Sequence, residues 1–167
     1  GKLMLKLSAP AIIAQIVNVL YNIVDRIFIG RMPSGDLAMA GVGVAFPIIL
    51  IISAFSSLVG MGGAPLAAIK MGEDDNEGAE KIMANSFCLL IIIALILTTG
   101  IFIFKEPILV AFGASDKTLG YALDYISIYV LGTVFVQIAL GMNAYINTQG
   151  FAKIGMMTVA IGAIINI

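Results

Sequence analysis

The stretch LAMAGVGVAFPIILIISAFSSLVGMGGAPLAAI occupies residues 37–69 and contains no charged side chain. As a single α-helix it would rise about 50 Å, whereas the hydrocarbon core of a bilayer is about 30 Å thick. The stretch therefore predicts a membrane-spanning helix that tilts, breaks or projects from the lipid. Pro47 predicts a kink, and the glycines and proline at 60–65 predict a bend or interruption between Met61 and Pro65.

Further uncharged stretches follow the same pattern along the chain. A spanning helix needs about 20 mostly apolar residues. We expect spans at about 8–29, 37–69, 82–104, 119–148 and 152–167, with the fifth cut off by the end of the chain. Several such stretches in series are not typical of buried helices in a soluble protein. The predicted fold class is all-α, a polytopic transmembrane helical bundle.

Composition supports this prediction and excludes several functions. Hydrophobic residues make up 60% of the chain and charged residues 11%, against about 45–50% and 25% in soluble domains. The net charge of −1 gives no basic surface for nucleic acid. The chain has no histidine, which removes Ser-His-Asp and Cys-His arrangements. We therefore do not expect an enzyme.

The distribution of charge leaves the orientation open. With the N-terminus inside, five lysines lie in inner segments and four basic residues in outer ones. This difference is too small to fix the topology, although we expect the N-terminus inside. The hydrophilic loop at 70–81 contains Glu73, Asp74 and Asp75. It departs from the EF-hand pattern and is interpreted as a solvated loop.

A polar face on the first span is the most informative feature for function. At about 100° per residue, several polar side chains fall on one side of this apolar helix. They are Gln15, Asn18, Tyr21, Asn22 and Asp25. Ionisable groups at such a depth usually face a bundle interior or a water-filled cavity. The alternative places Asp25 at the membrane interface, near Arg26.

A weaker polar stripe follows the fourth span. Its members lie at helical spacing: Gln137, Gly141, Tyr145 and Gln149. Gln137 and Tyr145 are candidates to line the same cavity as Asp25. Glutamine and glycine on one face also make ordinary helix–helix contacts, and the sequence does not choose between these interpretations.

Five motifs in order resemble the MATE (multidrug and toxic compound extrusion) family. They are LYNIVDRIFIGRM (20–32), GDLAMAGVGVAFPI (35–48), GMGGAPLAAIKMGEDDNEGAEK (60–81), FGAS (112–115) and NTQGFAKIGMMTVAIGAIINI (147–167). No single motif is highly specific, but their order and spacing fit the family over essentially the whole chain. Because the chain starts on Gly1 without an initiator methionine, we expect it to be an N-terminal piece of a longer protein.

The resemblance implies a function beyond what the residues themselves indicate. Family members have twelve spans in two lobes and export small organic, cationic drugs in exchange for Na⁺ or H⁺. Asp25 and Asn166 match the family's cation or proton site, so the expected metal is Na⁺ at Asp25. No other cofactor is implied. The expected partners are these drugs, the lipid bilayer and the missing C-terminal lobe, in the cell membrane of a bacterium.

Three other functions fit parts of the sequence less well. A flippase for lipid-linked saccharides in the same superfamily would be expected to line its cavity with more arginine and lysine. A membrane-embedded enzyme would need a catalytic histidine, a metal cluster or a Ser–Lys pair at depth. A structural membrane protein without cargo would have no need for Asp25 and its polar face.

Overall fold

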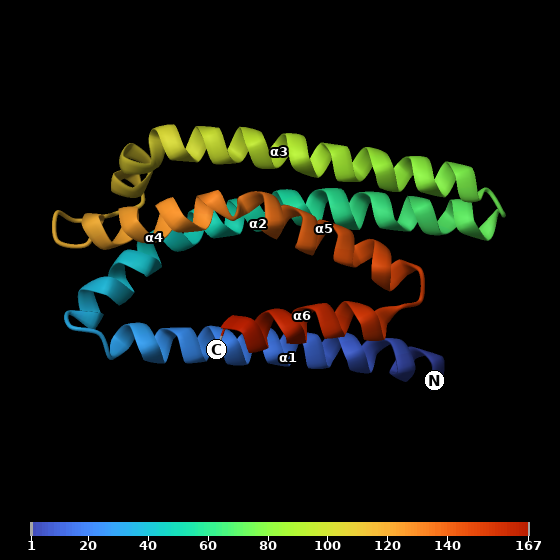
Figure 1. Cartoon of the computed structure of the whole chain (residues 1–167), viewed down its shortest axis with the longest axis horizontal. Helices are drawn as coiled ribbons and strands as arrows, with labels where there is room; N and C mark the ends of the chain where they lie inside the picture. The colour runs from blue at the N-terminus through green and yellow to red at the C-terminus, as the bar shows by residue number, and fades with distance from the viewer. Residues whose placement is uncertain (1, 167) are drawn as a thin grey trace.

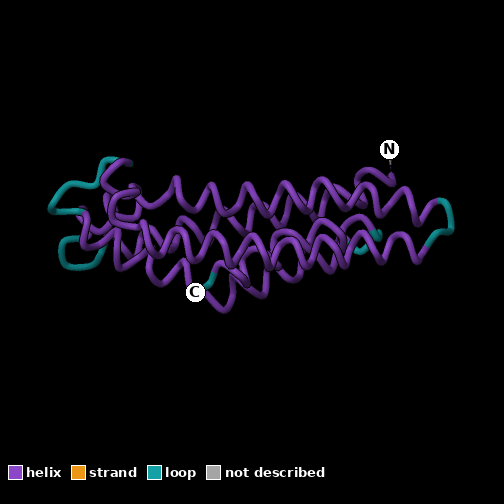
Figure 2. Tube along the Cα trace, turned by 90° about the horizontal axis from the view of Figure 1, so that it is seen from above, coloured by secondary structure: helices purple, strands orange, loops and turns teal. Residues whose placement is uncertain are grey.

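The computed structural model describes residues 2–166, and the side chains from Ser8 to Ile165 except Ala11. Within this range it contains helices and no strand, and the loops gather toward the ends of the bundle (Figure 1, Figure 2). The helices are α1 (Lys2–Gly30), α2 (Gly35–Gly72), α3 (Asn76–Ala111), α4 (Leu119–Leu131), α5 (Thr133–Thr148) and α6 (Ala152–Asn166).

The helices have the length and composition of membrane spans. Among the described residues, α1 from Ser8, α2 and α3 are each long and apolar enough to cross a membrane. The bent pair α4–α5 provides a fourth span when taken together, and α6 is a shorter apolar helix. The prediction of a helical membrane bundle is confirmed.

The central helix of the bundle is α2, which packs most extensively against α5 and α3. It is helical from Gly35 to Gly72, so an interruption between Met61 and Pro65 is wrong, while the bend expected there stays a prediction. Buried contacts on this stretch with α3 and α5 hold the helix together where proline removes one backbone donor. In Figure 1 the N-terminal part of α2 slants toward α1, and the remainder runs beside α3.

The fourth predicted span is divided into two helices. The axes of α4 and α5 meet at a bend of 58°. At the break, the Gly132 amide donates to the Tyr129 carbonyl at 3.0 Å, a tighter i to i−3 bond than the α-helical one. From α3, the Thr98 hydroxyl donates to the Val130 carbonyl at 3.4 Å. The sequence shows a glycine here, but not the contacts that stabilise the bend.

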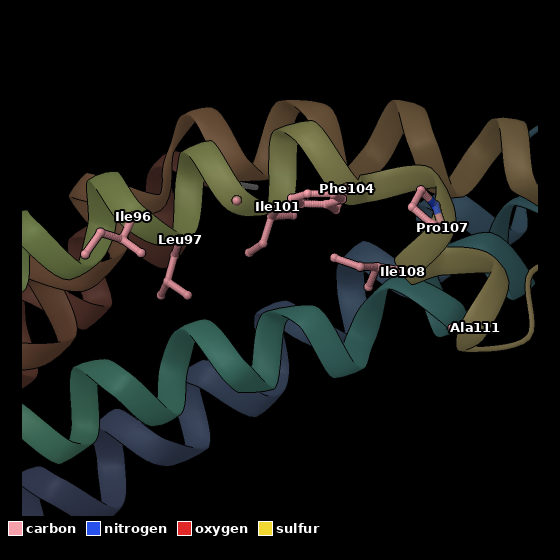
Figure 3. Close-up of a pocket in the computed structure, with 8 residues that line it drawn as sticks. Ile96, Leu97, Ile101, Phe104, Pro107, Ile108 and Ala111 are labelled. Carbon is pink, nitrogen blue, oxygen red and sulfur yellow. The ribbon is translucent and has the colours of Figure 1, made fainter.

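The third span extends past the predicted end at Phe104. Helix α3 continues through Pro107 to Ala111, and its last turns fold back beneath the helix (Figure 3). Leu109, which is fully buried in the core, anchors these turns to the bundle. The bend leaves an apolar groove of about 530 Å³ along α3, lined by Leu97, Phe104 and Ile108 among others.

Small residues allow a close helix contact between α2 and α5. A Cβ atom added to Gly60 would lie 2.7 Å from the Gly141 carbonyl oxygen. The main apolar core lies on one side of this contact, where Ile48 and Ile52 of α2 pack against Ile126 of α4. The position of α5 on α2 therefore depends on the absence of a side chain at Gly60.

We expect Gly60→Ala to lower the free energy of unfolding by about 1–3 kcal/mol, because its methyl group would push against backbone atoms. Gly62→Ala is the matched control, since a Cβ there meets nothing within 4 Å. That control should be neutral or slightly stabilising, as alanine is the better helix former. Thermal unfolding of the two purified variants in detergent measures the difference, and equal stability would contradict the close contact.

Candidate functional site

The polar face of α1 is divided between half-buried and exposed side chains. Asn18, Tyr21 and Asp25 are half-buried, whereas Gln15 and Asn22 are exposed. Helix α1 packs against α6 and, less extensively, against α2. The half-buried positions follow helical spacing, so Asn18, Tyr21 and Asp25 lie on the side of α1 that meets the bundle.

Hydrogen bonds and charge organise this face. The Asn22 side-chain amide donates to the Asn18 carbonyl at 2.8 Å and to the Asn18 side-chain oxygen at 3.1 Å. Toward the C-terminal end of α1, Asp25 is half-buried while its neighbour Arg26 is exposed. The two side chains differ in exposure, but both lie close enough to Tyr125 of α4 to act on it electrostatically.

An aromatic pair on α4 stands opposite the α1 face. The rings of Tyr125 and Tyr129 stack with centroids 6.2 Å apart and an interplanar angle of 23°. Asp25 and Tyr21 both lie close enough to Tyr125 to act on it electrostatically, and Tyr21 also acts on Tyr129. The fold thus brings the carboxylate of α1 and two phenol rings of α4 to one region.

Sequence reasoning missed these two tyrosines. An i, i+4 aromatic pair in an apolar helix is ordinary packing until its neighbours are known. The proximity of α4 to α1 comes from the bend at Gly132 and could not be derived from spacing along the chain.

Gln137 and Tyr145 are helix contacts in this structure. Gln137 is fully buried, accepts from the Ser56 hydroxyl at 2.8 Å and donates to the Ile52 carbonyl at 3.0 Å. The Tyr145 hydroxyl donates to Ser86 at 2.5 Å. Of the two interpretations of this stripe, the geometry corresponds to contact between α5 and its neighbours α2 and α3.

A second polar cluster, not predicted from the sequence, links α5 to α6. The Asn143 amide donates to the Gly155 carbonyl at 3.2 Å and to the Thr158 hydroxyl at 3.0 Å. Asn147 donates to the Asn143 side chain at 2.9 Å. Gly155 allows this approach, since a Cβ there would lie 2.5 Å from the Asn147 side-chain oxygen.

Asn166 lies in the last turn of α6, and its side chain is outside the described residues. Helix α6 packs along α1, and its C-terminal end lies beside that helix (Figure 1). The backbone of α6 therefore places Asn166 beside α1, the helix that contains Asp25.

Comparison with known proteins gives the family. The model of the MatE family matches residues 10–167. The chain belongs to the MatE family. The resemblance to MATE transporters is thereby confirmed, and with its apolar spans the chain is a multi-pass protein of the cell membrane.

Individual relatives cover nearly all of this chain. A multidrug export protein MepA from Staphylococcus haemolyticus is 27% identical over 94% of this chain. A FAD transporter from Shewanella oneidensis is 25% identical over the whole length of this chain. The solved structure of the MATE multidrug transporter DinF-BH matches 98% of the chain with a TM-score of 0.93 and 35% identity. The match covers 35% of the first protein and 36% of the other two, so the chain spans about a third of the length of these relatives.

We expect Gln137→Met to lower the free energy of unfolding by about 1–3 kcal/mol. The substitution keeps the shape approximately but leaves the buried Ser56 hydroxyl without its side-chain acceptor. Gln149→Met, at the exposed C-terminal end of α5, is the control and should change stability little. Thermal unfolding in detergent measures both, and an unchanged midpoint for Gln137→Met would show that the bonds do not hold α5 to α2.

Proposed function

We propose that this chain forms part of the N-terminal lobe of a secondary transporter that exports small organic cations in exchange for Na⁺ or H⁺. The observation that supports this most directly is the half-buried carboxylate of Asp25 on the bundle-facing side of an apolar span. The MatE family membership and the multidrug export relatives agree with the proposal.

The chemistry of exchange follows from the cost of a charge at that depth. A carboxylate in a partly dehydrated site is stabilised when a proton or a cation neutralises its charge. An organic cation is attracted to the same negative charge and also to the faces of aromatic rings. Asp25 and the nearby rings of Tyr125 and Tyr129 therefore offer one region for which cargo and coupling ion compete.

Competition of this kind produces coupling in both directions. If Na⁺ or H⁺ weakens cargo binding by some factor, cargo weakens ion binding by the same factor. In the proposed Na⁺ site, Asp25 supplies the carboxylate and Asn166 a side-chain oxygen. The packing of α6 along α1 supports this pairing.

Cationic cargo fits the described spans better than anionic cargo. The stretches 37–69 and 82–104 contain no lysine or arginine, and the carboxylate of Asp25 would repel a negative group. This distribution favours organic cations over a lipid-linked saccharide, whose phosphates would require basic partners. The similarity to a FAD transporter makes anionic cargo the alternative that experiment has to exclude.

We expect Asp25→Asn in the full-length protein to fold and insert but to lose coupled efflux, about tenfold or more. The amide keeps the shape of the side chain and removes the titratable charge. Asp36→Asn, which changes an exposed carboxylate at the start of α2, is the matched control and should retain efflux. The assay follows export of a fluorescent organic cation from vesicles under separate Na⁺ and H⁺ gradients. Normal export by Asp25→Asn under either gradient would exclude Asp25 as the coupling residue.

A further inference from the structure

We propose that the α2–α3 end of the bundle carries a second, peripheral site for small amphipathic cations. The site is the pocket where the end of α2, the start of α3 and the end of α5 meet. It lies at the opposite end of the bundle from the C-terminal part of α1, which carries Asp25 (Figure 1). Binding there does not require transport, so this inference goes beyond the proposed function.

The pocket combines an apolar floor with a polar rim. Its volume is about 270 Å³. The floor includes Met71, Met83 and the buried Tyr145, and the rim includes Asn76, Glu80 and Gln149. Drug-sized ligands usually occupy about 300–1,000 Å³, so this pocket fits a smaller molecule. Methionine side chains are flexible and polarisable, which suits an apolar body of variable shape.

The lining of the pocket contains one carboxylate, Glu80, which has no counter-ion among the described residues. Lys70 pairs with Glu73 at 2.9 Å and with Asp75 at 3.3 Å, and Lys81 pairs with Glu77 at 2.6 Å. Glu80 is the one charged residue among those that line the pocket, and it makes no hydrogen bond or ion pair with the described residues.

The ion pairs also fix the loop beside the pocket. The Gly78 amide donates to the Asp75 side chain at 2.9 Å, and this bond, together with Lys70, holds the pKa of Asp75 below its usual value. Asp75 thereby caps α3 while remaining charged. Because both lysines of this loop are engaged, a mobile cation is the remaining partner for Glu80.

The chemistry of the pocket selects the ligand class. Glu80 favours a positive charge and the acidic loop disfavours anions. The methionines favour a compact apolar body rather than a hydrated metal ion. A quaternary ammonium with one small aromatic group meets both requirements, with its charge at the rim and its ring against the floor.

The test uses the full-length protein in detergent, with benzyltrimethylammonium as the probe and isothermal titration calorimetry as the measurement. The Asp25→Asn background removes the carboxylate of the α1 face. We expect this background to lose any binding that depends on Asp25 and to retain the binding event of the peripheral site, which weakens at high ionic strength. Absence of measurable binding to the parent, or loss of binding in Asp25→Asn, would overturn the peripheral site.

Two matched variants locate the charge. In the Asp25→Asn background, Glu80→Gln should weaken probe binding about twofold to fivefold, the loss expected for an exposed charge contact. Glu77→Gln, three residues away and paired with Lys81 outside the pocket, should leave binding unchanged. Unfolding midpoints equal to that of the parent confirm that both variants fold. Equal affinity of Glu80→Gln and the parent would contradict the proposal.

Discussion

The contact of α2 with α5 is the constraint on which the arrangement of this lobe depends. Burying apolar surface between helices gains little free energy in lipid, because the lipid tails are equally apolar. Close van der Waals packing and buried hydrogen bonds therefore have to hold the helices together. Gly60 and Gly141 bring the two backbones into contact, and the bond between Gln137 and Ser56 fixes the same pair of helices. Tyr145 extends the contact to α3 through Ser86. These interactions define a scaffold of α2, α3 and α5.

The direction of α4 follows from that scaffold. Because α5 is held on α2, the 58° bend at Gly132 sets where α4 points. Thr98 of α3 donates to the Val130 carbonyl beside the break, which compensates part of the disrupted backbone bonding. The bend places Tyr125 and Tyr129 within electrostatic reach of α1. The aromatic side of the candidate site thus depends on a break in the helix as much as on the tyrosines themselves.

The sequence predicts the features that depend on one helix at a time. Long neutral stretches predict the helical membrane fold, and a helical wheel places Asn18, Tyr21 and Asp25 on one face. The sequence does not predict where a helix ends when packing against a neighbouring helix determines its length. Packing keeps α2 continuous through Pro65, and burial of Leu109 extends α3 past Pro107. The wheel also groups Gln137 with Tyr145 but cannot show that α2 and α3 enclose them. The opposition of Tyr125 to Asp25 requires the tertiary structure.

The uneven packing of the lobe bears on how ion binding could move it. Within this chain, none of the described residues in the most apolar window of α1 is buried, whereas 28% of the corresponding window of α2 and 17% of that of α3 are. Helix α1 packs mainly on α6, which contacts α5 but makes little contact with α2 or α3. In the proposed exchange, neutralising Asp25 changes the charge on the α1–α6 pair while the α2–α3–α5 scaffold keeps its buried contacts. Elements with few buried contacts rearrange at the lowest cost in free energy. Under the proposed exchange, the pair α1–α6 is therefore the part of this chain in which we expect a change of ion at Asp25 to produce movement.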